Sequence, residues 1–213
     1  MVDVTHGANV EVFTMFILQL FVFSAIVVVS VRSIPQVFRT FRSNSVAGVS
    51  PVSFALSGAG SLLWAGWGVA DGKLIALPGS LVGGSCAAAV LFALSRQGAR
   101  LTVALMAAAG YIVFGAAMFL VYGPLALSLT AACSGVGFAV FGLSAFLRFP
   151  DQGGVSLWSW GMVAYSELVW LCWGLVYMVP ASIISSGAGV LAVLVVMGLA
   201  SHSPRREVVL RCE

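Results

Sequence analysis

The segment Ser33–Ser50 reads SIPQVFRTFRSNSVAGVS, and it is the first long polar break in a chain that is otherwise almost continuously apolar. It contains Pro35-Gln36 followed by the basic residues Arg39 and Arg42. Of the 213 residues, 61% are hydrophobic and 8% are charged, whereas a soluble domain carries about 25% charged residues. The composition therefore predicts an integral membrane protein, in which this break forms a loop at the membrane surface.

Long apolar segments alternate with polar breaks along the rest of the chain. A membrane-spanning helix needs about 20 apolar residues. Cutting the chain at charges, prolines and polar clusters gives seven candidates, at residues 12–41, 49–70, 74–94, 101–122, 124–149, 155–177 and 180–200. The first is longer than one straight span requires, so we expect it to tilt or to lie partly at the interface. The predicted fold is an all-α integral membrane protein with seven transmembrane helices.

Basic residues in the loops predict the orientation of the chain, because they stay on the cytoplasmic side. The first, third and fifth loops and the C-terminal tail contain eight basic residues: Arg39, Arg42, Arg96, Arg100, Arg148, Arg205, Arg206 and Arg211. The alternate loops contain only Lys73. We therefore expect a multi-pass protein of the cell membrane, with the N-terminus outside and the C-terminus in the cytoplasm.

The chain also aligns with itself at an offset of 106 residues. Residues 42–68 align with 148–174 without a gap, and 9 of the 27 positions are identical, including Trp64 with Trp170 and Trp67 with Trp173. The offset places the second span on the sixth, so both copies cross the membrane in the same direction. This predicts a 3+1+3 arrangement of two parallel three-helix bundles: a first repeat at 12–95, a linker helix at 101–122, a second repeat at 124–200 and a cytoplasmic tail at 201–213.

The repeated Gly-Val-Ser motif predicts how two of the helices begin. Ser50 in GVSPVS is a predicted N-cap, and Pro51 then occupies the first helical position, where its missing N–H has no cost. Ser156 in GVSLWS is expected to cap the sixth span in the same way.

The segment PQVFRTFRSNSVAGVS, followed by LLWAGWGVADGKLIALPGS, resembles the PQ-loop superfamily and, within it, the SWEET and SemiSWEET sugar transporters. The resemblance covers residues 33–94 well and the second half more weakly. It implies alternating access by rocking of three-helix bundles, with Pro35-Gln36 as a hinge. The second copy has Phe141-Gly142 at these positions, so Gly142 is the candidate hinge there.

The same resemblance implies a substrate-binding site made from both copies. Trp64 and Trp170 would each offer an indole face to a sugar ring. Ser80 and Ser186 align with an asparagine of the family; a serine hydrogen-bonds a hydroxyl but lacks the amide's paired donor and acceptor. The second tryptophan of each copy, Trp67 or Trp173, lies one turn nearer the outer surface and is interpreted as a belt or gate residue.

Two charges are predicted to lie deep in the membrane. Arg32 is about 15 Å inward from Arg42, and Glu167 is about 16 Å inward from Ser156, at 1.5 Å per residue. Glu167 precedes Trp170 by three residues, so it should face the same cavity. We expect Glu167 to bind solute or carry a proton, with Arg32 as its counter-charge. The structural alternatives are a salt bridge between the two or a Glu167 held neutral by a backbone carbonyl.

These patterns leave three functions open. The leading one is facilitated diffusion of a small polar solute, a mono- or disaccharide. The second is a proton-coupled carrier of an amino acid or another charged solute, and the third is a non-transporting seven-helix receptor. Retinal binding is excluded for the third, because the single lysine, Lys73, lies in a predicted loop. The sequence has no pattern of an enzyme, cofactor, metal or nucleic-acid site, so the expected partners are a solute and the lipid bilayer; a homo-oligomer is compatible with it.

Overall fold

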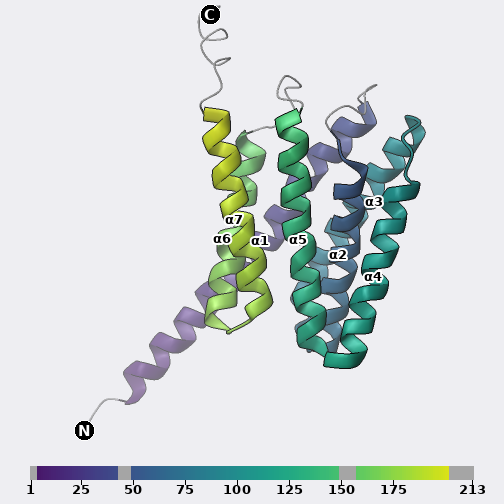
Figure 1. Ribbon diagram of the computed structural model, residues 1–213. Coiled ribbons are helices and arrows are strands. Elements are labelled where there is room, and N and C mark those ends of the chain that lie inside the picture. Colours follow the sequence, from purple (N-terminus) through teal and green to yellow (C-terminus); the bar gives the residue numbers. More distant parts are fainter. Residues whose placement is uncertain (1–3, 43–48, 149–156, 202–213) are drawn as a thin grey trace, which may run out of the picture.

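The structure is a computed structural model that describes residues 4–42, 49–148 and 157–201. These residues form seven α-helices and contain no strand (Figure 1). The helices are α1 (Val4–Arg42), α2 (Pro51–Ala70), α3 (Ala76–Arg96), α4 (Thr102–Tyr122), α5 (Pro124–Arg148), α6 (Leu157–Val176) and α7 (Pro180–Ser201).

The helix boundaries agree with the predicted spans to within two residues, except at the start of the chain. There α1 begins at Val4, eight residues before the predicted span. Its 39 residues have a length of about 58 Å at 1.5 Å per residue, which far exceeds the thickness of a hydrocarbon core. In Figure 1, α1 crosses the other helices obliquely and its N-terminal part extends beyond them. The expected tilt is therefore present.

The helices are long and apolar enough for a multi-pass membrane protein. Among the described residues, α2, α3 and α4 each meet the length and composition of a membrane span. The other four helices contain shorter apolar segments, at residues 19–31, 124–137, 161–176 and 180–195. Such a chain satisfies its backbone hydrogen bonds within each helix, as a bilayer requires.

The start of α2 has the predicted cap. Ser50 is the N-cap residue, its Oγ accepts a hydrogen bond from the Ser53 N–H at 3.2 Å, and Pro51 follows at the start of the helix. The equivalent cap at Ser156 lies outside the described residues. After α2, Gly72 has a positive φ of 68°, and 106 residues later Met178 also has a positive φ, of 52°.

The contacts between helices follow the 106-residue offset. In the first half α3 packs against both α1 and α2, and in the second half α7 packs against both α5 and α6. Across the halves, α1 packs against α6 and α2 packs against α5. The remaining helix, α4, packs against α2 and α5. The contacts among the six helices other than α4 thus follow the repeat, whereas the contacts of α2 and α5 with α4 have no counterpart on α6 and α1.

The largest described core lies where the two halves meet. This core cluster consists of Val22, Ala25, Leu63, Trp67, Leu127, Ala131, Val169, Trp173 and Val179. Its members come from α1, α2, α5 and α6 and from Val179, the residue before α7, and they gather toward the end of the bundle where α2 and α6 finish. The opposite end is where α1, α3 and α5 finish (Figure 1), at Arg42, Arg96 and Arg148.

Candidate functional site

The tryptophans of the two halves form matching pairs. Trp64 and Trp67 on α2 meet edge to face, with ring centroids 5.2 Å apart and planes at 79°. Trp170 and Trp173 on α6 do the same at 5.5 Å and 81°. Edge-to-face packing is a favoured geometry for aromatic rings. The repeat found in the sequence is therefore also a repeat of side-chain geometry.

Both pairs meet the same core cluster. Trp64 and Trp170 are partly buried and pack against it, whereas Trp67 and Trp173 belong to it and are only 3% and 6% exposed. A belt aromatic lies at the lipid-facing surface. The belt interpretation of Trp67 and Trp173 is therefore wrong, because helices from both halves cover these rings. Their interpretation as gate residues remains a prediction.

In the first half, a close contact between α2 and α3 shows which residue of α2 lies beside Ser80 along the helix axes. A Cβ atom added to Gly83 of α3 would lie 3.3 Å from the Oγ of Ser61 on α2. The two helices are antiparallel, so three residues forward on α2 and three residues back on α3 reach the same level. Those positions are Trp64 and Ser80. The serine thus lies level with the tryptophan that was predicted to act with it.

The second half has the same contact with a larger polar side chain. A Cβ atom on Gly189 of α7 would lie 2.9 Å from the carboxyl carbon of Glu167 on α6. The same step of three residues reaches Trp170 and Ser186, and Ser186 is 4% exposed. One turn of α7 earlier, Ser182 Oγ donates a hydrogen bond to the Trp170 carbonyl oxygen at 2.9 Å. The four predicted positions therefore form two equivalent pairs.

Sequence reasoning missed the two glycines that make these contacts. Gly83 and Gly189 are related by the 106-residue offset, and so are their partners Ser61 and Glu167. Both glycines lie beyond the aligned segments 42–68 and 148–174. Extending the self-alignment into the third helix of each copy would have found them.

The predicted pairing of Arg32 with Glu167 stays a prediction, because the Arg32 side chain lies outside those that the structure describes. A nearby contact defines the register: Ser24 Oγ on α1 and Tyr165 Oη on α6 share a hydrogen bond of 2.6 Å. The two helices run in opposite directions (Figure 1). From that bond, Arg32 lies eight residues toward one end of the bundle and Glu167 two residues toward the other. Pairing thus requires both side chains to extend toward each other along the helices.

One family model recognises part of this arrangement. Residues 17–77 match the PQ loop repeat. The matched segment covers most of α1, all of α2 and the first residues of α3, which is less than a third of the chain. No curated protein and no solved structure matches the chain. The match supports the PQ-loop superfamily, and with the apolar helices it indicates a multi-pass membrane protein compatible with a transporter.

The PQ-loop repeat contains the predicted hinge of the first half. Pro35 and Gln36 lie inside α1, which is continuous from Val4 to Arg42. Gly142, the candidate hinge of the second half, lies inside α5. The surroundings of all three residues fall outside what the structure describes. Their role as hinges remains a prediction.

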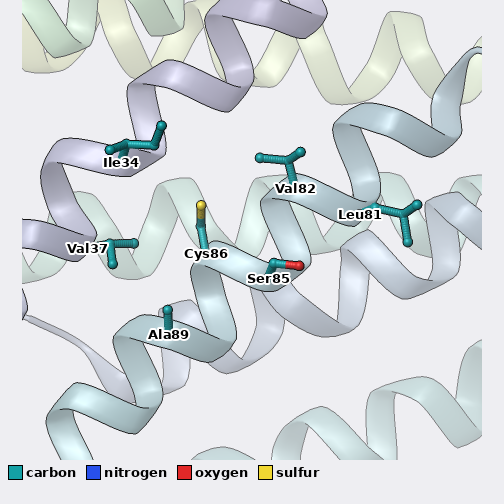
Figure 2. A pocket seen from close by; sticks show the side chains of 7 residues that line it. All are labelled: Ile34, Val37, Leu81, Val82, Ser85, Cys86 and Ala89. Atoms are coloured by element: carbon teal, nitrogen blue, oxygen red, sulfur yellow. The ribbon is translucent and has the colours of Figure 1, made fainter.

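One cavity among the described residues lies away from the predicted binding site. It has a volume of about 340 Å³ and lies between α1 and α3 (Figure 2). None of Trp64, Trp170, Ser80, Ser186 and Glu167 lines it. Trp64 and Trp170 pack against the core cluster, and a shared cavity for the five residues stays a prediction.

Proposed function

We propose that the protein is a transporter that moves a small polar solute, a mono- or disaccharide, by alternating access. In this proposal residues 12–95 and 124–200 are two three-helix bundles, and residues 101–122 link them. The helix contacts support it, because α1–α6 and α2–α5 are equivalent interfaces between the halves. Rocking at such a pair of interfaces would open the space between the halves toward one side at a time.

The observation that carries the proposal is that Trp64 and Trp170 pack against one cluster between the halves. Two indoles from equivalent positions could hold a flat sugar ring between them once the halves separate. Ser80 and Ser186, at the same levels, could hydrogen-bond its hydroxyl groups. The site residues thus come from both halves, as a pathway between them requires.

The core cluster would act as a closed gate in this proposal. We place the N-terminus outside and the C-terminus in the cytoplasm, since α1, α3 and α5 finish in arginine at one end. The cluster, with Trp67 and Trp173 as its largest members, then closes the outer half of the pathway. This conformation would release solute to the cytoplasm.

The test is uptake of labelled sugars, amino acids and organic cations into proteoliposomes, with and without a proton gradient. We expect uptake of a sugar that does not depend on the gradient. Uptake of no solute in the panel, by protein that remains folded, would contradict transport and favour the receptor.

A second candidate is a proton-coupled carrier of a charged solute. The contact of Glu167 with Gly189 favours this function. The first half has the uncharged Ser61 at the equivalent position, so the two halves differ in charge there. The two halves would then bind different ends of a solute, with the carboxylate binding an ammonium group or a proton. Gradient-dependent uptake in the same assay would select this function.

A further inference from the structure

The cavity between α1 and α3 has an apolar lining. Figure 2 shows side chains from both helices around it, with the Cys86 sulfur directed into the gap. The lining residues are Ile34, Val37, Leu81, Val82, Ser85, Cys86 and Ala89. Ile34 and Leu81 are 43% and 61% exposed, so the cavity is a groove open at the surface of the bundle.

The groove lies on the side of α3 opposite the proposed transport site. Gly83 and Ala87 face α2, where they meet Ser61 and Gly58. The groove-lining residues of α3 are centred about half a turn of the helix away from that stripe, at 100° per residue. In a multi-pass membrane protein, an apolar groove on this outer side is exposed to hydrocarbon.

The two helices that form the groove, α1 and α3, each have an arginine near their C-terminal end. On α1, Ile34, Phe38 and Arg42 follow one another at spacings of four residues, which places them on one stripe. The Arg42 guanidinium lies 5.9 Å from the centroid of the Phe38 ring. The two arginine-bearing helix ends are also held together, because Gln97 Nε2 donates a hydrogen bond to the Thr40 carbonyl oxygen at 2.6 Å.

The wall formed by α3 has the same order. Ala89, Phe92 and Arg96 lie at spacings of three and four residues on one stripe. Phe92 contacts Phe41 of α1, with ring centroids 6.3 Å apart. Arg42 and Arg96 are both exposed and lie about 8–10 Å beyond the last groove-lining residue of their helix at 1.5 Å per residue. Two cations therefore lie beyond one end of an apolar groove, as a phospholipid's phosphate and acyl chain require.

We propose that this groove binds an anionic phospholipid, with an acyl chain between α1 and α3 and the phosphate between Arg42 and Arg96. The paired arginines favour this occupant, since basic side chains at headgroup level attract anionic lipids. A second copy of the chain would bring its own Arg42 and Arg96 to the interface. Their charges would then repel each other instead of meeting a phosphate. This lipid site is separate from the proposed transport site and does not depend on transport.

Native mass spectrometry of the full chain tests the proposal, with equal amounts of phosphatidylglycerol and phosphatidylcholine added to the detergent solution. We expect one retained phosphatidylglycerol, preferred over phosphatidylcholine by more than about tenfold, as two basic contacts imply. The double substitution Arg42→Gln, Arg96→Gln should reduce that preference to near unity. Lys73→Gln, a charge removed from the other end of α3, should leave it unchanged. Equal retention of the two lipids by the wild-type protein would overturn the proposal.

The acyl chain is tested separately. Ala89→Phe fills the groove and should abolish lipid retention, whereas Ala117→Phe, on an exposed position of α4, should not. The alkylation rate of Cys86 tests the acyl chain in the wild-type protein, without a substitution. Its alkylation by N-ethylmaleimide should be slower in phosphatidylglycerol nanodiscs than in phosphatidylcholine nanodiscs, while that of the exposed Cys172 should not change. Equal Cys86 rates, or protection that instead follows the appearance of a dimer, would contradict a lipid in the groove.

Discussion

Glu167 fits against α7 because position 189 has no side chain: a Cβ atom there would lie 2.9 Å from the glutamate's Cγ, carboxyl carbon and Oε2. Real Cβ atoms essentially never approach other heavy atoms below 3.0 Å. The carboxyl group and the helix backbone thus define each other's position. The equivalent contact in the first half, Gly83 with Ser61, is looser at 3.3 Å and involves a shorter side chain.

Gly189→Ala should therefore displace the Glu167 carboxyl group. If that group binds solute or a proton, we expect transport to fall by about tenfold to a hundredfold, as small displacements of functional groups do elsewhere. Gly187→Ala is the matched control, because a Cβ atom there meets nothing within 4 Å. Proteoliposome uptake measures both variants. The double variant Gly189→Ala, Glu167→Ser should fold as well as wild type. An unchanged uptake rate in Gly189→Ala alone would show that transport does not depend on the position of the carboxyl group.

Glu167→Gln keeps the size of the side chain and removes its charge. In the proton-coupled function we expect uptake that no longer responds to pH, because the titrating group is gone. The measurement is uptake across a series of external pH values at constant membrane potential. A variant with the pH response of the wild type would leave Glu167 a structural role only.

The two tryptophans of one pair should respond differently to truncation. Trp64→Ala and Trp170→Ala should each abolish uptake with expression largely retained, because these rings are only partly buried. Trp67→Ala removes a ring that is 3% exposed and should lower the free energy of unfolding by about 3–5 kcal/mol. Uptake and thermal unfolding in detergent separate the two effects. Normal uptake by folded Trp64→Ala would exclude that ring from the site.

The contact between α2 and α5 should tolerate no added methyl group at Gly60. A Cβ atom there would lie 2.5 Å from the Cβ of Ser134, so Gly60→Ala should destabilise the protein by about 1–3 kcal/mol. Gly66→Ala on the same helix meets Leu127 at an ordinary 3.7 Å and should leave the protein at least as stable as wild type, because alanine is favoured over glycine inside a helix. Adding Ser134→Gly to Gly60→Ala should restore the unfolding temperature. Failure of that rescue would mean that the two residues are not in contact.

Met178 occupies a backbone conformation that suits glycine. With φ 52° it shares a positive φ with Gly72, the residue at the equivalent position of the first half. Left-handed backbone costs an L-residue about 1–2 kcal/mol, and glycine's greater freedom in the unfolded chain offsets part of the gain. Met178→Gly should therefore raise the free energy of unfolding by up to about 1 kcal/mol, and Gly72→Met should lower it. Thermal unfolding of the two variants shows whether each change raises or lowers the free energy of unfolding.

The helices could be predicted closely because the bilayer dictates their length and forces the polar residues into loops. The start of α1 could not, since residues 4–11 are too polar to count as a span, yet the helix continues through them. The faces by which the helices pack could not be predicted from the sequence either. In an apolar helix such as α2 every face is hydrophobic, so no periodicity indicates which face meets another helix. That is why Trp67 resembled a belt residue although α1 and α5 contribute to its cover.

The candidate site was partly accessible from the sequence, through the internal repeat. Trp64, Trp170, Ser80 and Ser186 were found because they recur at one offset. The structure places Trp64 level with Ser80 and Trp170 level with Ser186, and their role in a shared site stays a prediction. The Arg32–Glu167 pairing rested on depth alone, measured as if α1 stood upright. An oblique helix rises less per residue along the bundle axis, so that measure gives the greatest depth that Arg32 can have.

The burial of Trp67 and Trp173 has a thermal consequence for the proposed transport cycle. Opening the outer half would expose two indoles and their aliphatic neighbours to water. Hydration of apolar surface raises heat capacity, so the enthalpy of that step should change with temperature. Arrhenius plots of solute entry from the outside should then curve, whereas a step that leaves the cluster packed should give a straight line.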